Sequence, residues 1–403
     1  MRPFDGHTVV LGVSGGIASY KSAWLARLLT KAGAHVDAVL TRSATEFVSG
    51  LTFEALTGRP VHAGLFDPGR ALDHIGLARS ADAIVVAPAT ADFLARAASG
   101  QSGDLLTAIL LATKASVLLV PAMNDHMWAH RQTQANVSHL RSLGYRMLEP
   151  EEGMLAAGEG EGPGRMPEPE TIFAHVARLL ESSTPSRLAG RSVLVTAGPT
   201  REAIDPVRFI SNHSSGRMGV AIASAAWRRG AEVSLVAGPL SVATPVGARV
   251  RVVSTTDEMA RVVGELLPTT DVLVMAAAPS DFRPTHVATS KIKKSAKAPV
   301  LSTEATPDIL KSTANRRRAN AIVVGFALET DDAVASGRKK LDDKSLDLIV
   351  VNDATEPGAG FGVDTNRVTL IDRLGTEEKL PLLSKTEVAD AILDRVEQLA
   401  RGR

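Results

Sequence analysis

The sequence of 403 residues contains no cysteine, almost no net charge and no long apolar run. The absence of cysteine excludes disulfides, thiolate metal sites and a cysteine nucleophile. A formal net charge of +1 gives no overall basic field for nucleic acid or membrane surfaces, so an anion would have to be bound locally. No apolar stretch reaches membrane-spanning length, and the first apolar run is too short for a signal peptide. We therefore expect a cytoplasmic protein that binds neither nucleic acid nor membranes.

The sequence does contain two successive series of short apolar strands that alternate with amphipathic helices. Such alternation indicates parallel, doubly wound sheets, and the length favours two domains. We predict an α/β protein of two tandem Rossmann-like domains with mainly parallel sheets, at residues 1–181 and 191–403, joined by a linker at 182–190. The predicted strands lie at 9–13, 35–40, 84–87 and 117–120 in the first domain and at 192–196, 233–236, 272–275, 322–326 and 348–351 in the second.

Two polar segments interrupt this pattern. Residues 149–170 are rich in glycine, proline and acidic residues, which predicts either a disordered segment or a functional flap. Residues 284–299 carry four lysines without an apolar period, which predicts a mobile basic loop. A solvated lysine cluster is the ordinary explanation of such a run.

Residues 195–219, VTAGPTREAIDPVRFISNHSSGRMG, link a strand to a helix through a long polar loop. The SSG sequence at 214–216 opens the helix, where free backbone N–H groups and the positive end of the helix dipole make a site for an anion. Arg201, Arg208 and Arg217 add positive charge, so the stretch predicts a ligand that carries phosphate. A capped helix with solvated arginines is the alternative.

The first turn of the first domain, SGG at 14–16, departs from the GxGxxG pattern of dinucleotide sites. The second strand ends in TRSAT at 41–45 instead of an acidic residue for the ribose hydroxyls, so a tandem nicotinamide oxidoreductase is disfavoured. Hydroxyl side chains suit the single phosphate of a mononucleotide or flavin. The roles of two residues are left undecided by the sequence pattern. Asn124 is either a helix N-cap or an amide that binds substrate, and His74 is either structural or catalytic.

Residues 195–219 closely resemble the signature of phosphopantothenate–cysteine ligases. In the first half, SGGIASYK, TRSATEF, HIGLAR, APATADF and PAMNDHMW resemble the flavin-dependent cysteine decarboxylases, above all phosphopantothenoylcysteine decarboxylases. Together these motifs cover nearly the whole chain, which resembles the bacterial bifunctional decarboxylase/ligases of coenzyme A biosynthesis. The resemblance implies CTP-dependent ligation of L-cysteine to 4′-phosphopantothenate, followed by FMN-dependent decarboxylation to 4′-phosphopantetheine. It also implies a homo-oligomer built from N-terminal trimers and C-terminal dimers.

For the decarboxylase half, the resemblance implies an FMN close to subunit boundaries, which oxidises the substrate thiol so that the carboxylate can leave as CO2. His74 would handle a proton, since histidine titrates near neutral pH, and Asn124 would hold the carboxylate by its amide. The expected FMN contacts are Ser14, Gly15, Gly16, Thr41, Ser43, Thr45, Pro88 and Thr90.

The flap departs from the family pattern. Relatives usually carry a cysteine there in an ACG-like setting, whereas this chain has Ala157, and Arg165 follows as a clamp for the closed flap. Alanine cannot transfer a proton. The alternative function is therefore an active ligase joined to an altered or non-catalytic flavin-binding domain.

For the ligase half, the resemblance implies that phosphopantothenate attacks the α-phosphate of CTP and that cysteine then displaces CMP from the acyl-cytidylate. Asn212 would hold this intermediate, Arg208 would assist the attack of cysteine, and Lys291 would reach the triphosphate. Mg²⁺ is expected mainly on the CTP phosphates, with Asp281 as its candidate protein ligand.

Several of the implied CTP contacts have ordinary structural explanations on sequence alone. Phe326 is a core aromatic by its setting, and Lys340 and Lys344 form an exposed helix face at i, i+4 spacing. The resemblance assigns these residues to the nucleotide. The expected CTP contacts are Ala276, Ala277, Ala278, Asp281, Lys291, Pro307, Asp308, Ile309, Leu310, Phe326, Lys340 and Lys344.

Overall fold

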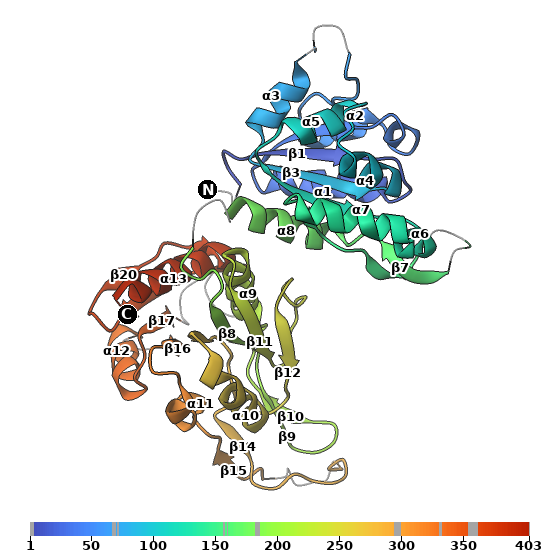
Figure 1. Ribbon diagram of the computed structural model, residues 1–403. Coiled ribbons are helices and arrows are strands. Elements are labelled where there is room, and N and C mark those ends of the chain that lie inside the picture. Colours follow the sequence, from blue (N-terminus) through green and yellow to red (C-terminus); the bar gives the residue numbers. More distant parts are fainter. Residues whose placement is uncertain are drawn as a thin grey trace. The chain divides into compact units, whose positions relative to one another are not determined.

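The computed structural model describes residues 4–66, 70, 72–155, 158, 160–181, 186–293, 300–329, 333–353 and 362–402. The chain divides into two compact units, Met1–Ser183 and Thr184–Arg403, coloured from blue to green and from green to red in Figure 1. Within the described ranges, no helix is both long enough and apolar enough to cross a membrane.

Five strands form the main sheet of the first unit: β1 (Thr8–Val13), β2 (His35–Leu40), β3 (Ala83–Ala89), β4 (Ser116–Pro121) and β5 (Arg146–Met147). They are parallel and follow the order β2-β1-β3-β4-β5. The chain moves outward from β1 to β2 and then crosses back to β3, so its right-handed connections place helices on both faces of the sheet. The predicted doubly wound α/β fold is confirmed for this unit.

Alternate residues of each strand enter two separate cores. Val9, Leu11 and Val13 of β1 pack with α1 (Ser19–Lys31), α2 (Gly50–Thr57) and α8 (Pro169–Glu181). Val10 points to the opposite face and packs with the helices there. Because both faces are buried, the strands are mainly apolar, as is usual for parallel sheets, although β2 also buries Asp37. The helices of the opposite face are α3 (Asp73–Ser80), α4 (Ala91–Ala98), α5 (Leu105–Ala112) and α7 (Arg131–Ser142), and the short α6 (Asp125–Ala129) follows β4.

The glycine-rich segment before α8 forms an antiparallel hairpin of β6 (Glu151–Met154) and β7 (Glu161–Arg165). The hairpin packs onto the turn that follows β4, where the backbone N–H of Met123 donates to the carbonyl of Gly164 at 3.0 Å. A Cβ added at Gly164 would lie 2.2 Å from the carbonyl oxygen of Met123, so this contact requires glycine. Of the two predictions for this segment, the described strands agree with an ordered flap.

Eight strands form the main sheet of the second unit, in the order β12-β11-β8-β13-β16-β17-β19-β20. All neighbours are parallel up to β17, and the two edge pairings, β17 with β19 and β19 with β20, are antiparallel. The prediction of a second, mainly parallel sheet is confirmed. The strands are β8 (Ser192–Ala197), β11 (Glu232–Ala237), β12 (Arg249–Val252), β13 (Val272–Met275), β16 (Ile322–Glu329), β17 (Leu348–Asp353), β19 (Val368–Asp372) and β20 (Glu377–Lys379).

Helices cover both faces of this second sheet. On one face, α10 (Thr256–Leu266), α11 (Ile309–Ser312) and α12 (Ala333–Asp343) share a core with Leu194 of β8. On the other, α9 (Arg217–Arg228) packs against β8 and against α13 (Lys385–Leu399). The approach of α9 is close, because a Cβ added at Gly219 would lie 2.6 Å from the Cβ of Ala197.

Short antiparallel strand pairs occupy loops of the second unit. β9 (Arg201–Ala203) and β10 (Phe209–Ser211) form a hairpin, so the prediction of a continuous polar loop after β8 was wrong there. β14 (Phe282–Pro284) pairs with β15 (Thr303–Ala305) on either side of the basic segment, of which residues 294–299 lie outside the described ranges. The remaining pair is β18 (Thr365–Asn366) with β21 (Leu383–Ser384), and single 3-10 turns lie at Ala44–Glu46, Leu267–Thr269, Ala314–Arg316 and Ala400–Gly402.

Candidate active sites

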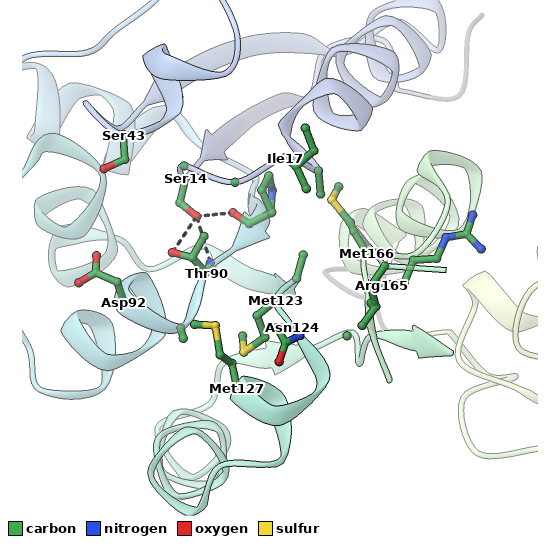
Figure 2. A pocket seen from close by; sticks show the side chains of 18 of the residues that line it. Ser14, Ile17, Ser43, Thr90, Asp92, Met123, Asn124, Met127, Arg165 and Met166 are labelled. Atoms are coloured by element: carbon green, nitrogen blue, oxygen red, sulfur yellow. Dashed lines mark hydrogen bonds between the residues drawn. The ribbon is translucent and has the colours of Figure 1, made fainter. Parts of the chain in front are cut away.

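The larger of two described cavities lies in the first unit and has a volume of about 540 Å³. It opens at the carboxyl ends of β1, β2, β3 and β4, and the β6–β7 hairpin contributes to its wall (Figure 2). This is the edge at which doubly wound sheets bind their ligands. Seven of the eight predicted FMN contacts line it, namely Ser14, Gly15, Gly16, Thr41, Ser43, Pro88 and Thr90.

Ser14 joins two turns of this cavity. Its buried hydroxyl donates to the carbonyl of Pro88 at 2.8 Å and accepts from the backbone N–H of Thr90 at 3.0 Å, as Figure 2 shows. Thr90 in turn caps α4, because its hydroxyl accepts from the N–H of Phe93 at 3.3 Å. The side chain of Ser14 therefore fixes the shape of the cavity and is already engaged in the protein's own hydrogen bonds.

The two glycines of the first turn differ in how much space a side chain would have. A Cβ added at Gly15 would lie 2.4 Å from the Cβ of Ser43, so any side chain would push the turn after β2 away. A Cβ at Gly16 would meet only Thr90, at 3.6 Å. Thr45, the eighth predicted FMN contact, is not among the lining residues, and its hydroxyl donates to the carbonyl of Arg42 at 2.7 Å.

Sequence reasoning missed an apolar wall of this cavity. Four of the nine methionines in the chain line it, and Ile17 lies opposite Met166 in Figure 2. Methionine is flexible and polarisable, so such a wall adapts well to a flat aromatic ligand. Only the sequence separation of these residues concealed them, since they come from different turns. The methionines are Met123, Met127, Met154 and Met166.

The two predicted decarboxylation residues are not brought together within the chain. Asn124 lines the cavity; its Oδ1 accepts from the N–H of His126 at 2.9 Å and caps α6, so the Nδ2 amide is the group that it offers to a ligand as a donor. His74 lies on α3 and is not among the lining residues. Its Nδ1 is buried without a hydrogen-bond partner in the part of the chain that the structure describes.

The base of the hairpin is tied to α1 by a charged cluster. Lys21, which lines the cavity and is buried, donates from Nζ to the carbonyl of Met166 at 2.8 Å and to Glu168 at 3.2 Å. Arg165 also pairs with Glu168, and in Figure 2 its guanidinium points away from Ser14. Ala157, the residue predicted to replace the flap cysteine, lies outside the described residues.

The second cavity, of about 250 Å³, lies in the second unit beside the start of α9. The predicted phosphate cradle at 214–216 lines it, together with six of the twelve predicted CTP contacts. The lining residues that sequence reasoning missed include the polar Asn352, Asn366 and Lys385, which come from the last third of the chain. The predicted contacts that line the cavity are Ala276, Ala277, Ala278, Asp281, Phe326 and Lys340.

Asn212 lies beside this cavity, and hydrogen bonds from its side-chain amide fix its position. Its Nδ2 donates to the carbonyls of Ala278 and Pro279, at 3.2 and 2.9 Å. The hydrogen bonds connect the loop before α9 to the loop after β13, which carries the predicted cytidine contacts. Only Oδ1 of Asn212 is left to bind a ligand, as an acceptor.

Arg208 and Ile292 of the basic segment both donate hydrogen bonds to a buried carboxylate. Asp205 accepts from Nε of Arg208 at 2.9 Å and from the backbone N–H of Ile292 at 3.1 Å. Arg208 also donates to the carbonyl of Ile292 at 2.7 Å. Hydrogen bonds from Arg208, and then those from the backbone N–H groups, hold the pKa of Asp205 well below its usual range despite burial. Lys291 therefore lies next to an anchored residue, although it does not line the cavity.

Apart from Lys291, five predicted CTP contacts do not line the cavity, and several of them have structural contacts. Asp308 caps α11 through the N–H of Lys311 and pairs with Lys344 at 3.1 Å, and although burial opposes the shift, Lys344 lowers the pKa of Asp308. Ile309 and Leu310 are buried in the core. Pro307 and Lys344 are not among the lining residues either.

No group of three or more acidic, histidine or cysteine side chains suited to a metal ion occurs among the described residues. Asp281, the predicted ligand for Mg²⁺, lines the second cavity with an exposed side chain. Any divalent cation at this position would thus depend mainly on oxygens that arrive with a ligand.

Two family models match the chain. Residues 2–181 match the flavoprotein family, and residues 188–399 match the C-terminal domain of DNA/pantothenate metabolism flavoproteins. The coenzyme A biosynthesis bifunctional protein CoaBC of Vibrio cholerae is 44% identical over 99% of this chain and 100% of its own length. That of Mycobacterium tuberculosis H37Rv is 46% identical over 98% of this chain and 97% of its own length.

A crystal structure of the C-terminal domain of a CoaBC protein is similar to the second half. It is 38% identical, covers 54% of this chain and 98% of its own, and superposes with a TM-score of 0.47. The full-length identities, together with the two family models that cover the two units, establish the family. The chain belongs to the bifunctional CoaBC proteins of coenzyme A biosynthesis.

Proposed function

We propose that the chain catalyses two consecutive steps of coenzyme A biosynthesis. The second unit uses CTP to join L-cysteine to 4′-phosphopantothenate through an acyl-cytidylate, and the first unit decarboxylates 4′-phosphopantothenoylcysteine to 4′-phosphopantetheine with FMN. The observation that carries the proposal is the full-length identity of 44% to a bifunctional relative, with a separate cavity in each unit.

The first cavity suits FMN in volume and in chemistry. A volume of about 540 Å³ falls within the range of small-molecule sites. Thr41, Ser43 and the backbone at Gly16 supply hydroxyl and N–H donors for one phosphate, and the methionine wall suits the flavin ring. When bound there, the flavin would accept electrons from the substrate thiol, which allows the neighbouring carboxylate to leave.

The chain's own residues would hold the substrate and move its protons. The Nδ2 amide of Asn124 donates to the substrate carboxylate, because its Oδ1 is committed to the helix cap. Lys21 keeps the hairpin fixed over the cavity through Met166 and Glu168, which limits the access of water. His74 moves the proton, and it must reach the cavity from a second copy of the chain.

The proposed second copy would belong to an oligomer of the first unit, for which we infer the trimer that the resemblance implies. His74 does not line the cavity of its own chain, and Ile17 and Tyr20 line that cavity while staying 66% and 63% exposed. Large apolar side chains at the mouth of a site are suited to cover by a neighbouring subunit. A C-terminal dimer is supported more weakly by the exposed Val207 and Phe282 of the neighbouring β9–β10 and β14–β15 hairpins.

In the ligase unit, Oδ1 of Asn212 accepts a hydrogen bond from the acyl intermediate. Arg208, which Asp205 holds in place, assists the attack of cysteine. Lys291 contacts the triphosphate and stabilises the charge on the departing pyrophosphate. Mg²⁺ would be held mainly by the CTP phosphates, and Asp281 is the protein residue that would bind it.

The alternative function, an active ligase with a non-catalytic flavin domain, rests on the alanine at position 157. A visible spectrum of the purified protein tests for bound flavin. Release of CMP and pyrophosphate from CTP, phosphopantothenate and cysteine tests the ligase, and CO2 release from phosphopantothenoylcysteine tests the decarboxylase. Flavin with CMP but without CO2 would establish the alternative, and the absence of CMP would refute the ligase assignment.

A further inference from the structure

The second cavity concentrates positive charge in a chain that is nearly neutral. Arg217, Lys340 and Lys385 line it, against the single carboxylate of Asp281, whereas the whole chain has a formal net charge of +1. A local excess of cations inside a cavity raises the concentration of anionic ligands there. Two of these cations, Arg217 and Lys385, lie next to each other and are not explained by the cytidine contacts.

Lys385 occupies an unfavourable position for a lysine. It is 8% exposed and is the first residue of α13, where the helix dipole disfavours a positive charge. Burial and the charge of Arg217 lower the pKa of Lys385, while Asp364 opposes the shift. A buried lysine at the start of a helix, beside an arginine, usually has a functional reason.

Arg217 begins α9 and is held by a carboxylate that is easily displaced. Its guanidinium pairs with Asp364, whose side chain is 84% exposed. Exposed ion pairs of this kind contribute little to stability because water screens them. Nε of Arg217 is buried without a hydrogen-bond partner in the described part of the chain, so the guanidinium is not fully satisfied by the carboxylate.

The segment at 363–364 contacts both cations. Nζ of Lys385 donates to the carbonyl of Val363 at 2.6 Å, and the backbone N–H of Lys385 donates to the carbonyl of Asp364 at 2.9 Å. The carboxylate of Asp364 thus reaches Arg217 from a backbone that is fixed at Lys385. It lies where the oxygen atoms of a bound anion would bind to the guanidinium.

We propose that Arg217 and Lys385 together form a phosphate-binding site in this cavity, and that Asp364 occupies Arg217 until a phosphate group displaces it. The inference rests on the proposed ligase function, in which both CTP and 4′-phosphopantothenate carry phosphate. Asp364 then acts as a built-in competitor, so binding of the phosphate exchanges one anionic partner of Arg217 for another.

The first test is Lys385→Met in the full-length protein. Loss of one charged hydrogen bond should raise the KM of the ligand whose phosphate binds here by about tenfold or more. Lys385→Arg keeps the charge and should restore most of the affinity. Lys379→Met removes an exposed lysine of β20, outside the cavity lining, and should leave both KM values unchanged.

The second test uses a change of opposite sign. Asp364→Asn removes the competing charge from an exposed position and should lower the same KM by up to about fivefold. A purely structural role for the cluster predicts that both substitutions act in the same direction, through loss of the folded unit. Thermal unfolding of each variant, followed together with KM, separates the two cases.

The two phosphate sources are distinguished by which KM changes. A rise for CTP alone assigns the site to the nucleotide, and a rise for 4′-phosphopantothenate alone assigns it to the acid substrate. Calorimetric titration with inorganic pyrophosphate tests the site without turnover, so it is informative even if the proposed ligase activity fails. Equal pyrophosphate affinity and equal KM values in wild type and folded Lys385→Met would overturn the inference.

Discussion

The two cavities differ in how completely one unit assembles the residues predicted for them. The first collects seven of eight predicted FMN contacts into one cavity of about 540 Å³. The second collects six of twelve predicted CTP contacts, and Lys291 and Lys344 lie outside its lining. A cofactor that stays bound favours a preformed site, whereas a substrate that enters and leaves at each turnover can be met by segments that converge on it. The difference matches a resident flavin and a transient triphosphate.

The largest effect should come from His74→Asn, because His74 is the predicted catalytic residue that does not line the first cavity of its own chain. Loss of a general acid or base typically costs about 10²- to 10⁴-fold in rate, so CO2 release should nearly cease while CMP release persists. Mixing this variant with Asn124→Ala before reassembly should recover part of the CO2 release, because in the proposed oligomer the two residues act from different copies. Loss of both activities in a folded protein would contradict the separation of the sites.

Lys291→Gln tests convergence in the second site. By analogy with a lost oxyanion donor, pyrophosphate release should fall by about 10²- to 10³-fold, with the flavin spectrum and CO2 release intact. Lys297→Gln, at a position outside the described residues, is the control and should matter far less. Small and equal effects of the two changes would mean that the lysines are only a solvated cluster.

Gly15→Ala tests how preformed the first site is. The added Cβ would lie 2.4 Å from Ser43, and overpacking of this kind costs about 1–3 kcal/mol, so flavin affinity should fall by roughly tenfold. Gly16→Ala adds the same atom at a position with its nearest contact at 3.6 Å and should lose less flavin. Fluorescence titration of the apoprotein measures both, and equal affinities would argue against a rigid cradle.

Arg165→Ala should have the smallest effect. The arginine pairs with the half-exposed Glu168, and such pairs contribute about 1 kcal/mol or less, so decarboxylation should slow by up to about fivefold without loss of flavin. Arg141→Ala breaks a comparable exposed pair with Glu149, away from the cavity lining, and serves as the control. An unchanged rate for Arg165→Ala would leave the hairpin without a clamp at this residue.

The sequence was sufficient for the apolar strands of both main sheets, but not for β5, β12, β19 and β20 and not for all of the site. Strands such as β1 and β13 follow from local apolar runs between polar segments, so their positions could be read directly. The β6–β7 hairpin could not, because its glycine-rich sequence has low strand propensity and depends on the backbone contact of Gly164 with Met123. Lys385 was missed for a similar reason, since only tertiary folding brings it to Arg217.

Assignments by resemblance also had a limit. Motif matching placed His74 and Asn124 in one reaction, yet only Asn124 lines the cavity of its own chain, because sequence similarity does not show how residues far apart in the sequence are brought together. In the same way, Ile309 and Leu310 match nucleotide contacts while their side chains are buried in the core. Buried side chains leave the backbone as the part of such a motif that can reach a ligand.

The anchoring of Ile292 to Asp205 bears on the effective concentration of Lys291. The backbone N–H of Ile292 donates to Asp205 at 3.1 Å, so Lys291 is held beside Arg208 and a bound triphosphate would meet it at a raised effective concentration. The pKa of Asp205 is lower in the folded protein than in the unfolded chain, where an aspartate titrates near pH 4. Ionised Asp205 therefore stabilises the fold above about pH 4, and this contribution is lost as the pH falls through the lower pKa of the folded state. The hydrogen bonds that position Lys291 are therefore retained throughout the neutral pH range.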